Sequence, residues 1–113
     1  MRNAKQELLE AVKESKQNIV CAEIIYYGTT DYDHYVNEED KQHITLNANH
    51  TEEEYHKFLN ELNFEYYSGY GGQELFGTVW LSNNTWLERG EYDGSEWWEF
   101  KECPTIPDSL KGE

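Results

Sequence analysis

The chain has 113 residues, of which 23 are Asp or Glu and 9 are Lys or Arg, giving a formal net charge of −14. This length predicts one domain, and the aromatic residues (four Trp, nine Tyr and four Phe) supply apolar area for a core although only 37% of the residues are hydrophobic. The charge argues against direct binding to nucleic acid or to an anionic membrane, because phosphate groups need Lys and Arg to neutralise them. No apolar run is long enough to span a membrane.

The first half of the chain predicts two helices and two strands. Residues 3–17 have the apolar spacing of a helix, with Leu8 and Val12 on its stripe, and Ile19 to Tyr27 has the alternation of a buried strand. A polar loop follows at 28–41, then a short strand at 43–47. Thr51 and Glu54 form the sequence pattern of a capping box, which predicts that a helix spans 51–63.

The second half predicts a β-meander over residues 64–103, followed by a tail at 104–113. Strands are expected at 75–82 and 85–92, joined by a two-residue turn at Asn83 and Asn84, and a third strand is expected after the Asp93-Gly94 turn. We therefore predict a single α+β domain over residues 1–113, with an antiparallel sheet of about five strands ending in a β-meander. Two helices are expected to pack on one face of that sheet.

The Asp93-Gly94 turn fixes a pairing register in which carboxylates meet across the last hairpin. It places Glu91 opposite Glu96 and Glu88 opposite Glu99. Like charges in opposed positions destabilise a hairpin by about 0.2–1 kcal/mol per pair. Three compensations remain open: nearby Arg89 and Lys101, a bridging divalent cation, or a cationic side chain of a partner.

The same register assigns side chains to the two faces of the sheet. Tyr92 and Trp97 are expected to share the face of Glu88 and Glu99, where exposed aromatics beside charge are typical of interface anchors. The opposite face is expected to form the core, with Phe76, Trp80, Leu87, Trp98 and Phe100.

Acidic residues also alternate in the polar loop and near the last turn, a spacing that places them on one face of an extended chain. From charge and position, we expect a basic partner to contact twelve residues: Asp31, Asp33, Glu38, Glu39, Asp40, Glu88, Glu91, Tyr92, Asp93, Glu96, Trp97 and Glu99.

The sequence predicts neither a cofactor nor a metal site, and no catalytic residue. The four histidines fit no zinc-site spacing, and Cys21 and Cys103 do not form a disulfide framework. The segment Glu99-Phe100-Lys101 has the E-x-K form of some metal-dependent nucleases, but the region has few cations to hold a substrate backbone. The N-terminal segment has no apolar region of a secretory signal, so we expect a cytoplasmic protein.

The segment from Trp86 to Glu99 is similar to the ending of small proteins of tailed bacteriophages. In size and charge the chain also resembles phage anti-defence proteins, the anti-restriction and anti-CRISPR inhibitors, several of which mimic DNA. That resemblance implies a host nuclease or its DNA-binding surface as the partner. Two alternatives stay open: an immunity protein that neutralises a cationic toxin, and a divalent-metal-binding module or small metal-dependent enzyme that uses the acidic hairpin.

Overall fold

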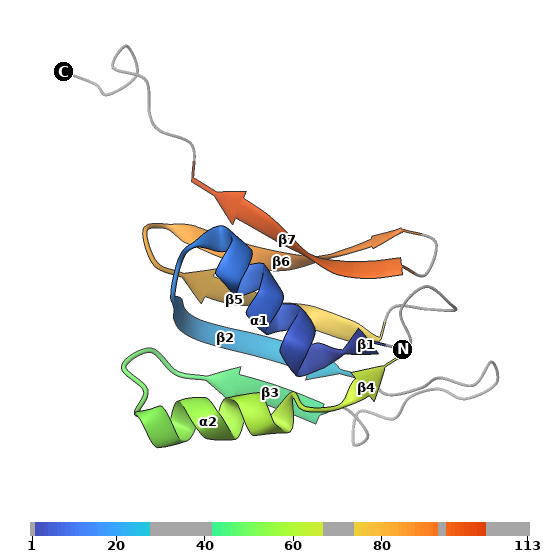
Figure 1. The fold of residues 1–113 in the computed structure, drawn as a ribbon, viewed down its shortest axis with the longest axis horizontal. Helices are drawn as coiled ribbons and strands as arrows, with labels where there is room; N and C mark the ends of the chain where they lie inside the picture. Colours follow the sequence, from blue (N-terminus) through green and yellow to red (C-terminus); the bar gives the residue numbers. More distant parts are fainter. Residues whose placement is uncertain (1, 28–41, 67–73, 93–94, 104–113) are drawn as a thin grey trace, which may run out of the picture.

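The computed structural model describes residues 2–27, 42–66, 74–92 and 95–103 (Figure 1). Its elements in chain order are β1 (Arg2–Asn3), α1 (Ala4–Ser15), β2 (Ile19–Tyr26), β3 (Gln42–Leu46), α2 (Glu52–Glu61), β4 (Glu65–Tyr66), β5 (Leu75–Leu81), β6 (Thr85–Tyr92) and β7 (Ser95–Glu102). No helix among these residues is long and apolar enough to cross a membrane.

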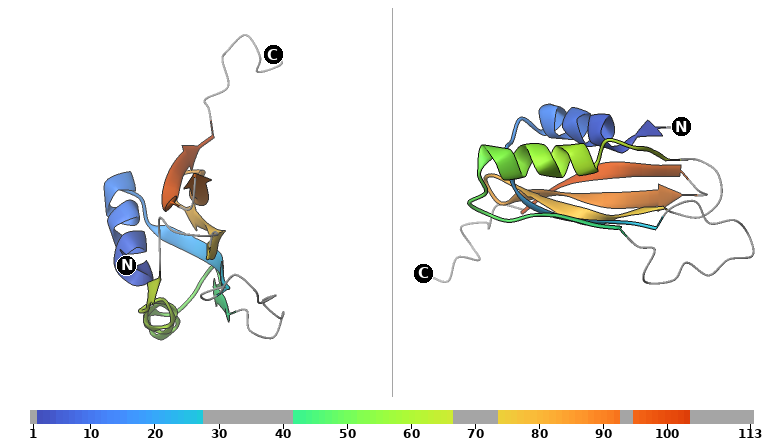
Figure 2. Two further views of the ribbon diagram at one scale, coloured as in Figure 1. Left: turned by 90° about the vertical axis from the view of Figure 1, so that its right-hand side faces the viewer. Right: turned by 90° about the horizontal axis from the view of Figure 1, so that it is seen from below.

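The main sheet has five strands in the order β3-β2-β5-β6-β7, and every pairing in it is antiparallel. Strands β3 and β7 are its two edges. Figure 2 shows both helices on the same face of this sheet, which confirms the predicted α+β architecture. A second sheet of two short strands, β1 and β4, was not expected from the sequence.

Local capping interactions explain where the two helices begin. The side chain of Asn3 accepts a hydrogen bond from the Gln6 amide at the start of α1. At the start of α2, the Thr51 hydroxyl accepts from the Glu54 amide, while the Glu54 carboxylate accepts from the Thr51 amide. The predicted capping box is therefore confirmed, and each cap satisfies helix N–H groups that have no partner within the helix.

The hydrophobic core lies between the sheet and the two helices. Leu8 of α1, Phe58 of α2 and Tyr66 of β4 cover the sheet from the helical side. The sheet contributes inward side chains from all five strands: Ala22, Ile24, Ile44, Leu46, Leu75, Val79, Leu81, Leu87 and Trp98. The alternation predicted for Ile19 to Tyr27 would place Val20 on the buried face with Ala22 and Ile24. Val20 is instead exposed, because the pairing of β2 with β5 shifts by one residue between Ile19 and Cys21.

The register of the β5–β6 hairpin differs from the predicted one. Leu81 pairs with Thr85 and Trp80 pairs with Trp86, so the connection contains three residues, 82–84, in place of a two-residue turn. Because side chains alternate along a strand, a shift of one residue exchanges the two faces of β5. Trp80 and Phe76, predicted in the core, are therefore exposed on the other face.

Gly77 permits β5 to lie close against β2. Its φ is +144°, a conformation that L-amino acids rarely adopt, and a Cβ built at this position would lie 2.8 Å from the Ile24 Cα and still closer to the Glu23 carbonyl oxygen. The obstructing atoms belong to the backbone of the neighbouring strand, so rotation of a side chain cannot relieve the contact.

We expect Gly77→Ala to lower the free energy of unfolding by about 2 kcal/mol or more, because it adds both backbone strain and a backbone contact. Urea denaturation measures this change. The neighbouring Thr78→Ala is the control and should cost less than about 1 kcal/mol. Equal effects of the two substitutions would contradict the close approach at Gly77.

Candidate partner-binding face

The face of the main sheet that points away from both helices carries the candidate site, and we call it the open face. Among the residues that the structure describes, no helix or strand covers it (Figure 2). It consists of the outward-pointing side chains of β2, β5, β6 and β7 together with Tyr27, which follows β2. The alternation of the strands and the exposure of each side chain place it on this face.

Large aromatic side chains gather on the open face. Tyr92 is 77% exposed, Trp80 is 43% exposed, and Phe76 and Trp97 are each 37% exposed. Trp86 is half-buried beside Trp80. Single exposed apolar residues are ordinary on protein surfaces, but a group of large aromatics on one sheet face is typical of a binding surface.

The charged side chains of the open face are mostly acidic. Glu23 of β2, Glu88 of β6 and Glu99 of β7 are all exposed there. Across the described ranges, Lys101 is the one Lys or Arg on this face, and its Nζ lies 3.7 Å from the Glu99 carboxylate. Arg2 and the lysines of the two helices belong to the opposite, helical side of the sheet.

The pairing predicted for the β6–β7 hairpin is confirmed. Glu88 lies opposite Glu99, and Glu91 lies opposite Glu96. The Glu88–Glu99 pair is on the open face, where the Trp86 indole N–H donates a 2.7 Å hydrogen bond to Glu88 and Lys101 lies beside Glu99. Lys101 thus acts as one of the compensating cations anticipated from the sequence.

The Glu91–Glu96 pair is on the helical side, and there the prediction for Glu96 needs correction. Its side chain is fully buried, so in this conformation it is unavailable to a partner. The backbone N–H groups of Glu74 and Leu75 donate to its carboxylate at 2.8 and 3.0 Å. Glu96 therefore anchors the start of β5, a structural role that satisfies a buried charge with hydrogen bonds.

Arg89 supplies the positive charge for this buried group. Its side chain is 2% exposed, and its guanidinium donates to Glu96 at 3.0 Å and forms an ion pair with Glu7 of α1. It also donates to the Tyr66 hydroxyl at 2.9 Å and lies 4.8 Å from the centre of the Trp98 ring. We call Arg89, Glu7, Glu96 and Tyr66 the buried ion network; it joins α1, β4, β6 and β7.

Two pKa values in the buried ion network are displaced. Burial raises the pKa of the Tyr66 phenol, and the hydrogen bond from that phenol to Glu7 raises it further, against the opposing effect of Arg89. Burial lowers the pKa of Arg89, but Tyr66, Glu7 and Glu96 together outweigh this effect, so the pKa is raised. Both shifts favour a charged guanidinium beside a neutral phenol.

Trp97 is held on the open face by a glycine on the neighbouring strand. Gly90 is its pairing partner, and a Cβ built on Gly90 would lie 2.5 Å from the Trp97 indole. The ring therefore lies directly over the Gly90 backbone, an arrangement in which an aromatic side chain covers a glycine across the strands. Its orientation is set by packing, which lowers the entropy lost when such a side chain binds a partner.

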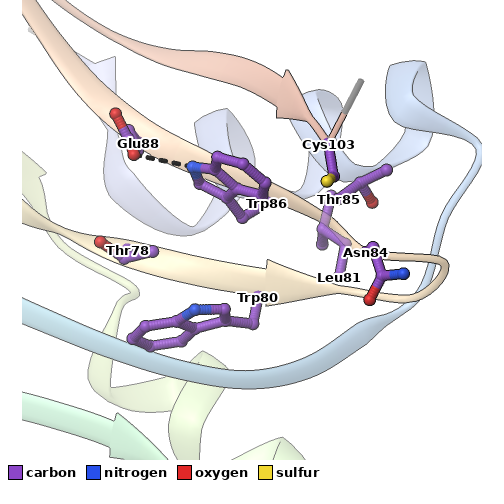
Figure 3. Close-up of a pocket in the computed structure, with 8 residues that line it drawn as sticks. All are labelled: Thr78, Trp80, Leu81, Asn84, Thr85, Trp86, Glu88 and Cys103. Carbon is purple, nitrogen blue, oxygen red and sulfur yellow. Dashed lines mark hydrogen bonds between the residues drawn. The ribbon is translucent and has the colours of Figure 1, made fainter. Parts of the chain in front are cut away.

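Trp80 and Trp86 line a groove of about 590 Å³ on the open face (Figure 3). The two residues are pairing partners on β5 and β6. Thr78 and Glu88 line the groove near one end, and Asn84 and Cys103 line it near the hairpin connection. The sequence prediction missed this groove because it depends on the three-residue connection; the apolar spacing of Leu75, Val79 and Leu81 was the available signal for the correct face.

The remaining predicted contact residues divide by location. Glu88, Tyr92, Trp97 and Glu99 lie together on the open face, whereas Glu91 is exposed on the helical side of β6. Six predicted residues lie outside the described part of the chain: Asp31, Asp33, Glu38, Glu39, Asp40 and Asp93. Within the described part, no group of three or more His, Cys, Asp or Glu side chains is arranged to hold a metal ion.

Comparison with protein-family models, curated proteins and solved structures finds no match for this chain. The geometry and charge of the open face are therefore the observations from which a role for this chain can be inferred.

Removing the charge of Arg89 should take the guanidinium away from the buried Glu96 carboxylate, while Glu7 keeps its ion pair with Arg2. We expect Arg89→Met to lower the free energy of unfolding by about 3–5 kcal/mol, as measured by urea denaturation. Lys101→Met is the matched control, because it removes a cation from an exposed pair on the same hairpin and should cost no more than about 1 kcal/mol. A small effect at Arg89 would show that the buried ion network contributes little.

The raised pKa of Tyr66 predicts a loss of stability at alkaline pH. The folded-state pKa lies above the unfolded value of about 10, so the stabilisation is complete below pH 10 and is lost as the pH rises above it. Tyr66→Phe lacks this titration. Between pH 10 and 12, the unfolding free energy should therefore fall less steeply in Tyr66→Phe than in the unsubstituted protein; equal slopes would contradict the assignment.

Proposed function

We propose that this chain is an acidic protein inhibitor that uses its open face to bind the basic, nucleic-acid-binding surface of a host nuclease or defence protein. The observation that carries the proposal is the composition of the open face, where exposed aromatic side chains stand among Glu23, Glu88 and Glu99. A binding role of this kind requires no reaction and no cofactor.

The presence of both exposed aromatic side chains and acidic side chains on the open face favours a protein partner. A face that only kept the chain dispersed in water would need charge but would not need exposed tryptophans. Aromatic side chains contribute most of the energy at the centre of protein interfaces, and charge around them steers the encounter with an oppositely charged surface.

The sign of the charge determines which kind of partner is favoured. The chain has a net charge of −14, so it repels nucleic acid and attracts cationic protein surfaces. Surfaces that bind nucleic acid are rich in Lys and Arg, because they neutralise phosphates. On such a surface, the carboxylates of the open face would occupy positions otherwise taken by phosphate groups.

The test uses a panel of purified restriction endonucleases and RNA-guided nucleases, with DNA binding and cleavage measured with and without the protein. We expect at least one member to lose DNA binding in its presence. Because the attraction is electrostatic, the inhibition should weaken by about tenfold or more when the salt concentration rises from 50 to 300 mM. A panel in which no member is inhibited, or an inhibition insensitive to salt, would count against the proposal.

A charge-matched pair of variants locates the binding face. Replacing Glu23, Glu88 and Glu99 by Gln should weaken inhibition by about tenfold or more. The control replaces Glu10, Glu14 and Glu53 by Gln; these exposed residues lie on the helices, so the net charge changes equally but inhibition should change by less than about threefold. Equal losses in the two variants would show that only the total charge matters.

A further inference from the structure

The groove between Trp80 and Trp86 has aromatic side chains along its walls and the carboxylate of Glu88 near one end. Figure 3 shows the two indoles on the same side of the sheet, with the indole nitrogen of Trp86 directed at Glu88. That nitrogen donates to Oε1 of Glu88 at 2.7 Å. Glu88 lines the groove, and among the described residues no hydrogen bond to its second carboxylate oxygen is present.

Two indoles next to a carboxylate match the requirements of a planar cation. A guanidinium stacks on aromatic rings, is attracted by their negative faces, and donates hydrogen bonds to a carboxylate in a fixed geometry. An ammonium is more strongly hydrated and lacks the flat surface, so it fits this groove less well. The net charge of the chain adds a long-range attraction for either cation.

We propose that the groove binds one arginine side chain of the cationic partner, with its guanidinium against the Trp80 and Trp86 indoles and hydrogen-bonded to Glu88. This inference rests on the proposed function, because it specifies how the open face recognises a basic surface. It names the point of contact at which an Arg of the partner is preferred to a Lys.

Two other occupants fit the groove less well. A nucleobase would stack on the indoles, but its phosphates would be repelled by Glu88 and by the rest of the acidic face. A second copy of the chain has only two arginines, and Arg89 is buried. The other, Arg2, lies in an ion pair with Glu7 at 2.9 Å.

The experiment titrates the ¹⁵N-labelled protein with the capped pentapeptide Gly-Gly-Arg-Gly-Gly while the tryptophan indole N–H signals are followed by NMR. The signals of Trp80 and Trp86, assigned through the Trp80→Phe and Trp86→Phe variants, should shift, whereas that of buried Trp98 should not. The same peptide with Lys should bind about threefold or more weakly, and with neutral, isosteric citrulline about tenfold or more weakly.

Two charge-matched variants separate the groove from the general field of the protein. Glu88→Gln removes the charge but keeps an oxygen that accepts from the Trp86 indole, and it should weaken the binding of the arginine peptide by about tenfold. Glu10→Gln removes the same charge from helix α1, on the opposite side of the sheet, and should change binding by less than about twofold. Trp80→Leu should also weaken binding by about fivefold or more.

Equal binding of the arginine and citrulline peptides, or equal losses in Glu88→Gln and Glu10→Gln, would overturn the arginine site. These outcomes are distinct from failure of the proposed function. If the nuclease panel is inhibited but Trp80→Leu and Trp86→Leu inhibit as well as the unsubstituted protein, only the arginine site is lost. If no nuclease is inhibited but the arginine peptide binds as described, only the choice of partner is lost.

Discussion

The positions of α1, β4 and the last hairpin relative to one another depend on one interaction, the burial of the Arg89 guanidinium among them. It lies between Glu7 of α1 and Glu96 of β7, and it donates to Tyr66 of β4, so one side chain joins segments that are far apart in the sequence. The same Glu96 carboxylate accepts from backbone N–H groups at the start of β5. A charge buried in this way requires a paired and hydrogen-bonded environment, and this requirement fixes how α1 lies over the last hairpin.

The two faces of the β6–β7 hairpin consequently lie in different environments, one toward the helices and one on the open face. Its helical side contains charges that are neutralised within the fold, while its open side carries Glu88 and Glu99 among exposed aromatics. The partial compensation by Trp86 and Lys101 permits the opposed carboxylates of the open side to coexist in the free protein. A cationic partner would add to this compensation, which gives the open face a physical reason to attract one.

Local signals in the sequence predicted those features that depend on neighbouring residues. The Asp93-Gly94 turn gave the correct register of the last hairpin, and Thr51 with Glu54 correctly marked the start of α2. Asn83 and Asn84 both have the positive φ, +61°, that a two-residue turn requires, but the connection contains a third residue, Ser82. The prediction of the β5–β6 register was therefore wrong by one residue, and Trp80 lies on the open face. The contact between Arg89 and Glu7 joins residues 82 apart, and no local pattern encodes such a pairing.

Because β7 lies at the edge of the sheet, the excess of carboxylates also bears on whether molecules of this protein associate with one another. Strand β7 has eight residues, among them two tryptophans and a phenylalanine, and within the described ranges no strand pairs with its outer side. Such an edge can pair with a similar strand of another molecule. Mutual repulsion between molecules of the same strong charge keeps such edges apart. A cationic partner would cancel part of that repulsion, so a complex must either shield this edge sterically or retain enough surplus charge to stay dispersed.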